Sequence, residues 1–197
     1  MPADSVIRVE AVASVPWEDV SQVFATRGDP ARCWCQYFKL PNREYETATP
    51  DACAGMLREQ TQARSPGPGV IAYLDGEPVG WCAVEPKPAY SRLQRARVVT
   101  EGSRQEPHDP SVWAVTCFVV RVGYRRRGVA AALLRGAVAQ ARGAGARVVE
   151  GYPVDLELRP KAPSAELYHG TTSLFAGAGF VEVARVRKDR VVMELVV

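Results

Sequence analysis

One stretch in the middle of the chain, residues 112–141, constrains the fold more than any other. Residues 112–120 form an apolar run rich in β-branched side chains, which predicts a buried strand. After a four-residue turn, an Ala- and Leu-rich segment reaching about Ala141 predicts a helix. Three arginines, residues 125–127, stand where this helix begins, although the positive end of a helix dipole disfavours cations. We therefore expect a phosphate or pyrophosphate at this turn.

Small residues in the same turn support this interpretation. Gly128 and Ala130 fall in the first helical turn, where small side chains allow a ligand to approach the backbone closely. The alternative is a solvated basic patch at the start of an ordinary helix. Other nucleotide motifs fit less well, because no Gly-x-x-x-x-Gly-Lys-Ser/Thr is present. Gly143-Ala144-Gly145 follows a helix and precedes a strand, the reverse of a dinucleotide-binding turn.

The motif Arg125-x-x-Gly128-x-Ala130, directly after a hydrophobic strand, resembles the acetyl-CoA signature (Gln/Arg-x-x-Gly-x-Gly/Ala) of the GNAT superfamily of N-acetyltransferases. The resemblance implies that backbone amides of the turn hold the CoA pyrophosphate and that the preceding strand pairs with the pantetheine arm. The cofactor-binding residues expected from it are Phe118, Val119, Val120, Arg125, Arg126, Arg127, Gly128, Val129, Ala130 and Ala131.

The remaining pattern predicts alternating strands and helices. The order of elements resembles the GNAT fold over essentially the full length: an α/β fold with a mixed central β-sheet of about six to seven strands and about four helices. The late segment 174–180 resembles the closing helix–strand junction of that superfamily. The other expected elements are a strand at 6–12, helices at 17–26 and 50–63, a hairpin of 69–74 and 79–85, a long loop at 86–110, a strand at 146–154, a helix at 164–177, and strands at 181–186 and 191–197.

Composition narrows the class of protein. With 197 residues, 47% of them hydrophobic and 24% charged, the chain is typical of one soluble globular domain spanning residues 1–197. A net charge of +3 is too small to favour a nucleic-acid partner. No apolar stretch approaches the roughly 20 residues of a membrane span, and no signal peptide is visible. We expect a cytoplasmic protein without membrane or nucleic-acid partners, with a monomer and a homodimer both open.

Five cysteines with irregular spacing are expected to remain reduced. Cys33 and Cys35 resemble half of a metal site. However, no second pair of Cys or His stands at a suitable spacing, and the only histidines are His108 and His169. We therefore expect no metal.

The resemblance implies direct transfer of an acetyl group from acetyl-CoA to an amine, without an acyl-enzyme. A free aliphatic amine has a pKa of roughly 10, so a proton acceptor helps to expose its lone pair. A backbone N–H of the central strand is a candidate donor to the oxyanion. An alternative is a non-catalytic module that binds acyl-CoA.

Two departures from the superfamily pattern leave the proton-transfer residues open. Phe175 stands where many members have the Tyr that protonates the leaving thiolate, and Ala114 or Thr116 stands where some have a Glu. Glu150 and Tyr168 are the favoured catalytic candidates, with Tyr152 and His169 as alternatives.

An aromatic segment, residues 32–38, is either core or the wall of an acceptor pocket. The long loop at 86–110 is the other candidate wall, because loops of this length are usually functional or mobile. A small-molecule acceptor is favoured over a protein. The expected acceptor-binding residues are Trp34, Tyr37, Phe38 and Tyr90.

Overall fold

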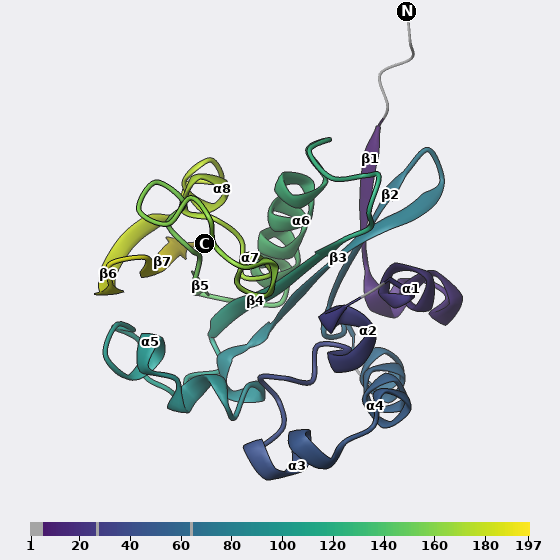
Figure 1. The fold of residues 1–197 in the computed structure, drawn as a ribbon, viewed down its shortest axis with the longest axis horizontal. Coiled ribbons are helices and arrows are strands. Elements are labelled where there is room, and N and C mark those ends of the chain that lie inside the picture. Colours follow the sequence, from purple (N-terminus) through teal and green to yellow (C-terminus); the bar gives the residue numbers. More distant parts are fainter. Residues whose placement is uncertain (1–5, 27, 64) are drawn as a thin grey trace, which may run out of the picture.

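A mixed sheet in the order β1-β2-β3-β4-β5-β7-β6 organises the chain (Figure 1). The computed structural model describes residues 6–26, 28–63 and 65–197, and the element counts below refer to these residues. Neighbouring strands are antiparallel except β4 and β5, which are parallel. The seven strands are β1 (Ile7–Ala11), β2 (Gly69–Leu74), β3 (Glu77–Pro86), β4 (Val112–Val120), β5 (Val148–Gly151), β6 (Val181–Arg187) and β7 (Arg190–Val196).

Eight α-helices and three short 3-10 helices accompany the sheet in the described residues, more helices than the four or so that the sequence pattern predicts. Five of the α-helices have only four to six residues, too few to produce a recognisable hydrophobic period. The helices are α1 (Trp17–Phe24), α2 (Asp29–Cys33), α3 (Asn42–Thr47), α4 (Pro50–Ala63), α5 (Arg97–Thr100), α6 (Val129–Gly143), α7 (Ser164–Leu167), α8 (Thr172–Ala176), η1 (Val12–Ser14), η2 (Lys87–Ala89) and η3 (Leu93–Arg95).

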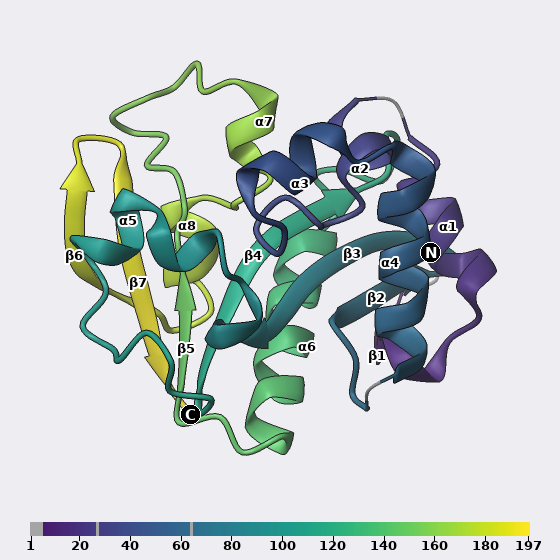
Figure 2. The same ribbon diagram turned by 90° about the horizontal axis from the view of Figure 1, so that it is seen from below.

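Helices cover both faces of the sheet, which explains why the central strands are apolar on both sides (Figure 2). The long helix α6 packs on one face through an apolar stripe that includes Leu133 and Ala137. Helices α1 and α4 pack on the opposite face, where Phe24 and Leu57 contact a cluster around Trp81. Strand β4 lies in the middle and contributes side chains to both layers.

Several sequence-based boundaries are confirmed and others are wrong. The hairpin of β2 and β3 forms at the expected turn, and α4 has the expected bounds. The helix expected at 164–177 is two helices, because Gly170 adopts a left-handed φ of 78° between them. The strand expected at 146–154 is only Val148–Gly151. The segment expected to be one long loop at 86–110 contains η2, η3 and α5.

The sheet opens between β4 and β5, and this opening creates the site. The two strands pair over only four positions, Val112–Val115 with Val148–Gly151. Beyond Val115, β4 continues to Val120 while β5 has ended, and the described chain diverges toward α7 (Figure 2). Residues 116–120 of β4 therefore present a strand edge that β5 does not cover.

A β-bulge marks the point where the opening begins. On the β3 side, Ala83 lies opposite Cys117 while Val84 lies opposite Val115, so Thr116 is an extra residue in β4. A bulge of this kind bends a strand and redirects its backbone groups. The bulge therefore coincides with the end of the β4–β5 ladder.

Candidate functional site

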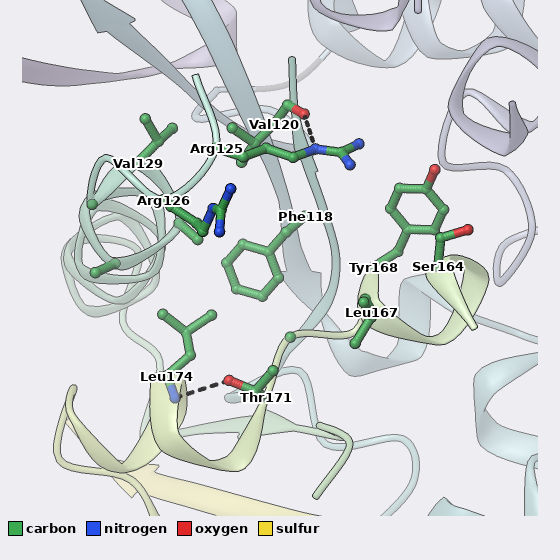
Figure 3. Close-up of a pocket in the computed structure, with 14 residues that line it drawn as sticks. Phe118, Val120, Arg125, Arg126, Val129, Ser164, Leu167, Tyr168, Thr171 and Leu174 are labelled. Atoms are coloured by element: carbon green, nitrogen blue, oxygen red, sulfur yellow. Dashed lines mark hydrogen bonds between the residues drawn. The ribbon is translucent and has the colours of Figure 1, made fainter. Parts of the chain in front are cut away.

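A pocket of about 430 Å³ lies between the uncovered edge of β4, the start of α6 and the segment that carries α7 (Figure 3). Its three walls come from parts of the chain that are far apart in sequence. The lining residues are Phe118, Val120, Arg125, Arg126, Gly128, Val129, Ala130, Ala131, Ser164, Leu167, Tyr168, Gly170, Thr171 and Leu174.

The first wall is the turn that leads into α6, and it is built to receive an anion. Arg126 and Gly128 both adopt left-handed backbone conformations, with φ of 60° and 79°. Alternating conformations of this type direct successive backbone N–H groups into one concavity. The first N–H groups of α6 add to this, because a helix start leaves them without intrahelical partners. The guanidinium groups of Arg125 and Arg126 supply positive charge at the same wall.

The second wall is the uncovered edge of β4. The N–H of Arg121 donates to the carbonyl of Val79 on β3, at 2.9 Å. Because strand backbone groups alternate in direction, the N–H groups of Phe118 and Val120 point the other way, toward the side that β5 leaves open. The Nε of Arg125 donates to the carbonyl of Val120 at 3.3 Å and joins the first two walls.

The third wall is formed by residues 164–174. Thr171 caps α8 by accepting a hydrogen bond from the N–H of Leu174 at 3.2 Å (Figure 3). Tyr168 is partly buried, and its ring faces the pocket beside Leu167 (Figure 3). Burial is the main cause that raises the pKa of the Tyr168 phenol, followed by the charge of Asp29. The phenol is therefore protonated at neutral pH and able to donate a proton.

Two bonds connect this third wall to β4. The N–H of Phe118 donates to the carbonyl of Tyr168 at 2.7 Å. The imidazole Nδ1 of His169 lies 3.0 Å from the carbonyl of Thr116, and because a carbonyl only accepts, Nδ1 carries the proton. Burial, followed by the charge of Arg190, lowers the pKa of His169 to about 4, so the imidazole is neutral at physiological pH.

Eight of the ten residues expected to contact a cofactor line this pocket, and two do not. Val119 points to the opposite face of the sheet and packs in the cluster around Trp81. Arg127 is exposed, with its guanidinium 5.7 Å from the centre of the Tyr124 ring. Five further lining residues are not expected from the sequence and reach the pocket only through the tertiary fold: Ser164, Leu167, Gly170, Thr171 and Leu174. Among these five residues, Gly170 is the one whose type most strongly indicates a turn in the sequence.

Glu150 does not line the pocket. Its carboxylate is fully buried and receives hydrogen bonds from Tyr152 at 2.7 Å and from Ser103 at 2.5 Å. The ammonium of Lys87, also fully buried, lies 2.8 Å away. With three partners and no exposed surface, this carboxylate anchors the segment that follows β3 to β5. Burial of the Tyr152 phenol, followed by the charge of Glu150, raises the pKa of Tyr152 well above its usual value.

The four residues expected to bind an acceptor also lie outside the pocket. Trp34 stacks on Phe24 with ring centres 4.9 Å apart, in the core beneath α1. Tyr90 is completely buried. Tyr37 is exposed and stacks on the guanidinium of Arg92 at 4.3 Å. Phe38 packs beside the third wall, with its ring centre 5.4 Å from that of His169.

The cysteines occur as free thiols. Cys35 is buried and accepts a hydrogen bond from the indole N–H of Trp81 at 3.1 Å. Burial is the main cause that raises the pKa of Cys33 to about 12, which keeps this thiol protonated. In the described part of the chain, no group of three or more Cys, His, Asp or Glu residues is arranged to hold a metal ion. None of the helices in that part is long and apolar enough to cross a bilayer.

Solved structures share the fold of this chain. An N-acetyltransferase from Staphylococcus aureus Mu50 superposes with a TM-score of 0.56 at 14% identity, covering 98% of this chain and 99% of that one. A ribosomal-protein-alanine N-acetyltransferase from Brucella melitensis gives a TM-score of 0.56 at 15% identity, with the same two coverages. At these identities the likeness concerns the fold, which is that of the N-acetyltransferases, as the order of elements predicts.

The sequence itself shows the family. Residues 34–160 match the family model described as acetyltransferase (GNAT) family, so the chain belongs to the GNAT family of acetyltransferases. As a member it is an acyltransferase, and its family activity is acetyl transfer. No curated protein matches the chain in sequence.

Proposed function

We propose that this protein is an acetyl-CoA-dependent N-acetyltransferase that moves an acetyl group directly to the amine of a small molecule, in preference to a protein. The observation that carries the proposal is the pocket itself. A basic turn with inward backbone N–H groups lies at one end, and a strand edge that β5 does not cover lies along its side. Acetyl-CoA has a matching distribution of chemistry, with phosphates at one end and an amide-containing arm at the other.

Different walls of the pocket would bind different parts of acetyl-CoA. The turn at residues 126–128, with the guanidinium groups of Arg125 and Arg126, would hold the pyrophosphate. The backbone of Phe118 and Val120 would pair with the amides of the pantetheine arm, as an added strand pairs with a sheet edge. When bound, acetyl-CoA supplies an acyl thioester already activated toward an amine. The apolar side chains of the pocket then exclude water from it.

Proton transfer must rely on groups other than those found in many family members. Phe175 has no proton to donate, and Glu150 is enclosed by Lys87 and two hydroxyl groups. Tyr168 is the one phenol that lines the pocket within the described residues, and its raised pKa keeps it protonated. We infer that Tyr168 donates a proton to the leaving thiolate and that solvent accepts the proton of the amine.

The test is to incubate the protein with acetyl-CoA and a panel of small amines and peptide N-termini, with release of the CoA thiol as the readout. We expect thiol release that depends on one amine class, and loss of both turnover and CoA binding in Gly128→Glu. The control Gly128→Ala imposes the same backbone strain without charge or bulk. Binding without turnover on any amine would instead support the alternative, a non-catalytic acyl-CoA-binding module, which the substitution of Tyr by Phe175 favours.

A further inference from the structure

A short strap, residues 168–170, occupies the edge of β4 at the point where β5 ends. The carbonyl of Tyr168 accepts a hydrogen bond from the N–H of Phe118 at 2.7 Å. Two residues earlier on β4, the carbonyl of Thr116 accepts from Nδ1 of His169 at 3.0 Å. The strap therefore replaces β5 as the neighbour of β4, and it does so beside the bulge and inside the pocket wall.

Close packing holds the strap against the pocket floor. Gly170 has a left-handed φ of 78°, and a Cβ built on it would lie 3.1 Å from Cε2 of Phe118 and 2.9 Å from Cε2 of Phe175. Only glycine fits this approach without displacing an aromatic ring. The carbonyl of Gly170 in turn accepts from the N–H of Val154 at 3.0 Å, which fixes the far end of the strap.

An ion-pair network fixes the near end of the strap from outside the pocket. Glu166, on α7, contacts Arg190 at 2.8 Å and Arg159 at 2.9 Å. Arg159 also contacts Asp189, in the turn between β6 and β7, at 2.7 Å. Both ends of the strap are thus attached to the body of the protein. Any motion between them is confined to a few backbone dihedral angles.

The contact between Tyr168 and Phe118 uses a group that the bound ligand needs. The N–H of Phe118 is the first outward donor beyond the bulge, and it is directed toward the open side of β4. One N–H makes one well-aligned hydrogen bond, so a ligand carbonyl lying along β4 and the carbonyl of Tyr168 exclude each other at this donor. Rotation of the peptide plane between Tyr168 and His169 would vacate the donor. Besides the bond to Phe118, that rotation breaks the 3.2 Å bond from the N–H of His169 to the carbonyl of Glu166.

We propose that the strap blocks one backbone donor of β4, with the Tyr168 carbonyl occupying the Phe118 N–H until acetyl-CoA displaces it. This inference rests on the proposed function, because it needs an acyl-CoA in the pocket. His169 acts as the latch of the strap, since its bond to the Thr116 carbonyl holds the closed arrangement. The latch does not open on protonation, because Nδ1 carries a proton in both the neutral and the charged imidazole.

The direct test uses the wild-type protein and NMR. The scalar coupling transmitted through the hydrogen bond between the Phe118 nitrogen and the Tyr168 carbonyl carbon is measured without ligand and with saturating acetyl-CoA. We expect the coupling to be present in the free protein and to vanish on binding. Binding with a retained coupling overturns the strap proposal alone. Absence of any acetyl-CoA binding overturns the proposed function and the strap proposal together.

A variant tests the energetic consequence. His169→Phe keeps a ring beside Phe38 but removes the donor to Thr116. Because one bond fewer then holds the strap against β4, displacing the Tyr168 carbonyl costs less, and we expect acetyl-CoA to bind about threefold to tenfold more tightly by calorimetry. His108→Phe, at the exposed second histidine, is the matched control and should leave the affinity unchanged. Weaker binding by His169→Phe at unaltered stability would mean that the strap belongs to the liganded site, contrary to the proposal.

Discussion

The ammonium of Lys87 and the carboxylate of Glu150 lie 2.8 Å apart, with both side chains completely removed from solvent. The pair joins η2, just after β3, to β5 on the sheet face opposite α6. Ser103 strengthens it by accepting from Lys87 at 2.6 Å and donating to Glu150 at 2.5 Å. The pair thus holds the segment between β3 and β4 against the sheet.

We expect Glu150→Gln to destabilise the fold rather than to alter the chemistry. The change leaves the Lys87 ammonium buried without its counter-charge, which costs about 3–5 kcal/mol of unfolding free energy. Urea unfolding measures the loss, and Glu106→Gln at an exposed position is the control. The double variant Lys87→Met with Glu150→Leu should recover much of the stability. If Glu150→Gln is fully stable but has a shifted pH–rate profile, Glu150 takes part in proton transfer, contrary to this prediction.

The three consecutive arginines should differ in their effect on CoA binding. Arg125 and Arg126 line the pocket, whereas Arg127 lies outside it over the Tyr124 ring. We expect Arg125→Ala and Arg126→Ala each to weaken CoA binding by about fivefold to tenfold, because exposed charge-assisted contacts to phosphate are worth roughly 1 kcal/mol. Arg127→Ala should change the affinity less than twofold. Equal effects at all three positions, measured by calorimetry, would indicate a diffuse basic patch instead.

Restoring the hydroxyl at position 175 should not restore a catalytic acid. Phe175 is fully buried, with its ring centre 6.0 Å from that of Phe118 and 5.0 Å from that of Phe180. A Tyr hydroxyl placed there without a partner costs about 1–3 kcal/mol. We therefore expect Phe175→Tyr to lower the urea midpoint without increasing the rate of thiol release. A faster, equally stable variant would show that the hydroxyl reaches the thioester.

His169 should make stability depend on pH below neutrality. Its pKa of about 4 in the folded protein lies below the usual value near 6.5, so the unfolded chain binds the proton more tightly. Its contribution is complete above about pH 6.5 and is lost as the pH falls toward 4, by up to about 3 kcal/mol. His169→Gln keeps a donor for Thr116 but does not titrate. The free energy of unfolding is measured from pH 7 to 4 for the wild type and for His169→Gln. We expect the wild type to lose more stability as the pH falls, and an equal loss in both proteins would contradict the prediction.

The thiols should be unreactive in the native protein. Burial raises the pKa values of Cys33, Cys53 and Cys82, and the pKa of Cys117 is raised by a hydrogen bond with Cys35, followed by burial. Since the thiolate is the reactive species, we expect a disulfide reagent at pH 8 to label the five cysteines much more slowly in buffer than in urea. Rapid labelling of one native thiol that acetyl-CoA prevents would place that cysteine at the site.

The strand–turn–helix of residues 112–141, and with it most residues of two pocket walls, could be predicted from the amino-acid sequence. These features were readable because each is local: a strand run, a turn with small residues and a helix start lie within 20 or so consecutive positions. The hairpin of β2 and β3 was readable for the same reason. The one-turn helices were not, because four to six residues carry no period and form only where the rest of the fold contacts them.

The different surroundings of Glu150, Tyr168 and His169 became visible only in the folded protein. In sequence all three were polar residues near a predicted site, and nothing distinguished a buried ion-paired carboxylate from a phenol that lines the pocket or an imidazole bonded to β4. The partners that distinguish them, Lys87 and Thr116, lie 63 and 53 positions away along the chain. Burial, ion pairing and hydrogen bonding act through space, so a side chain acquires its role only when the sheet brings distant strands together.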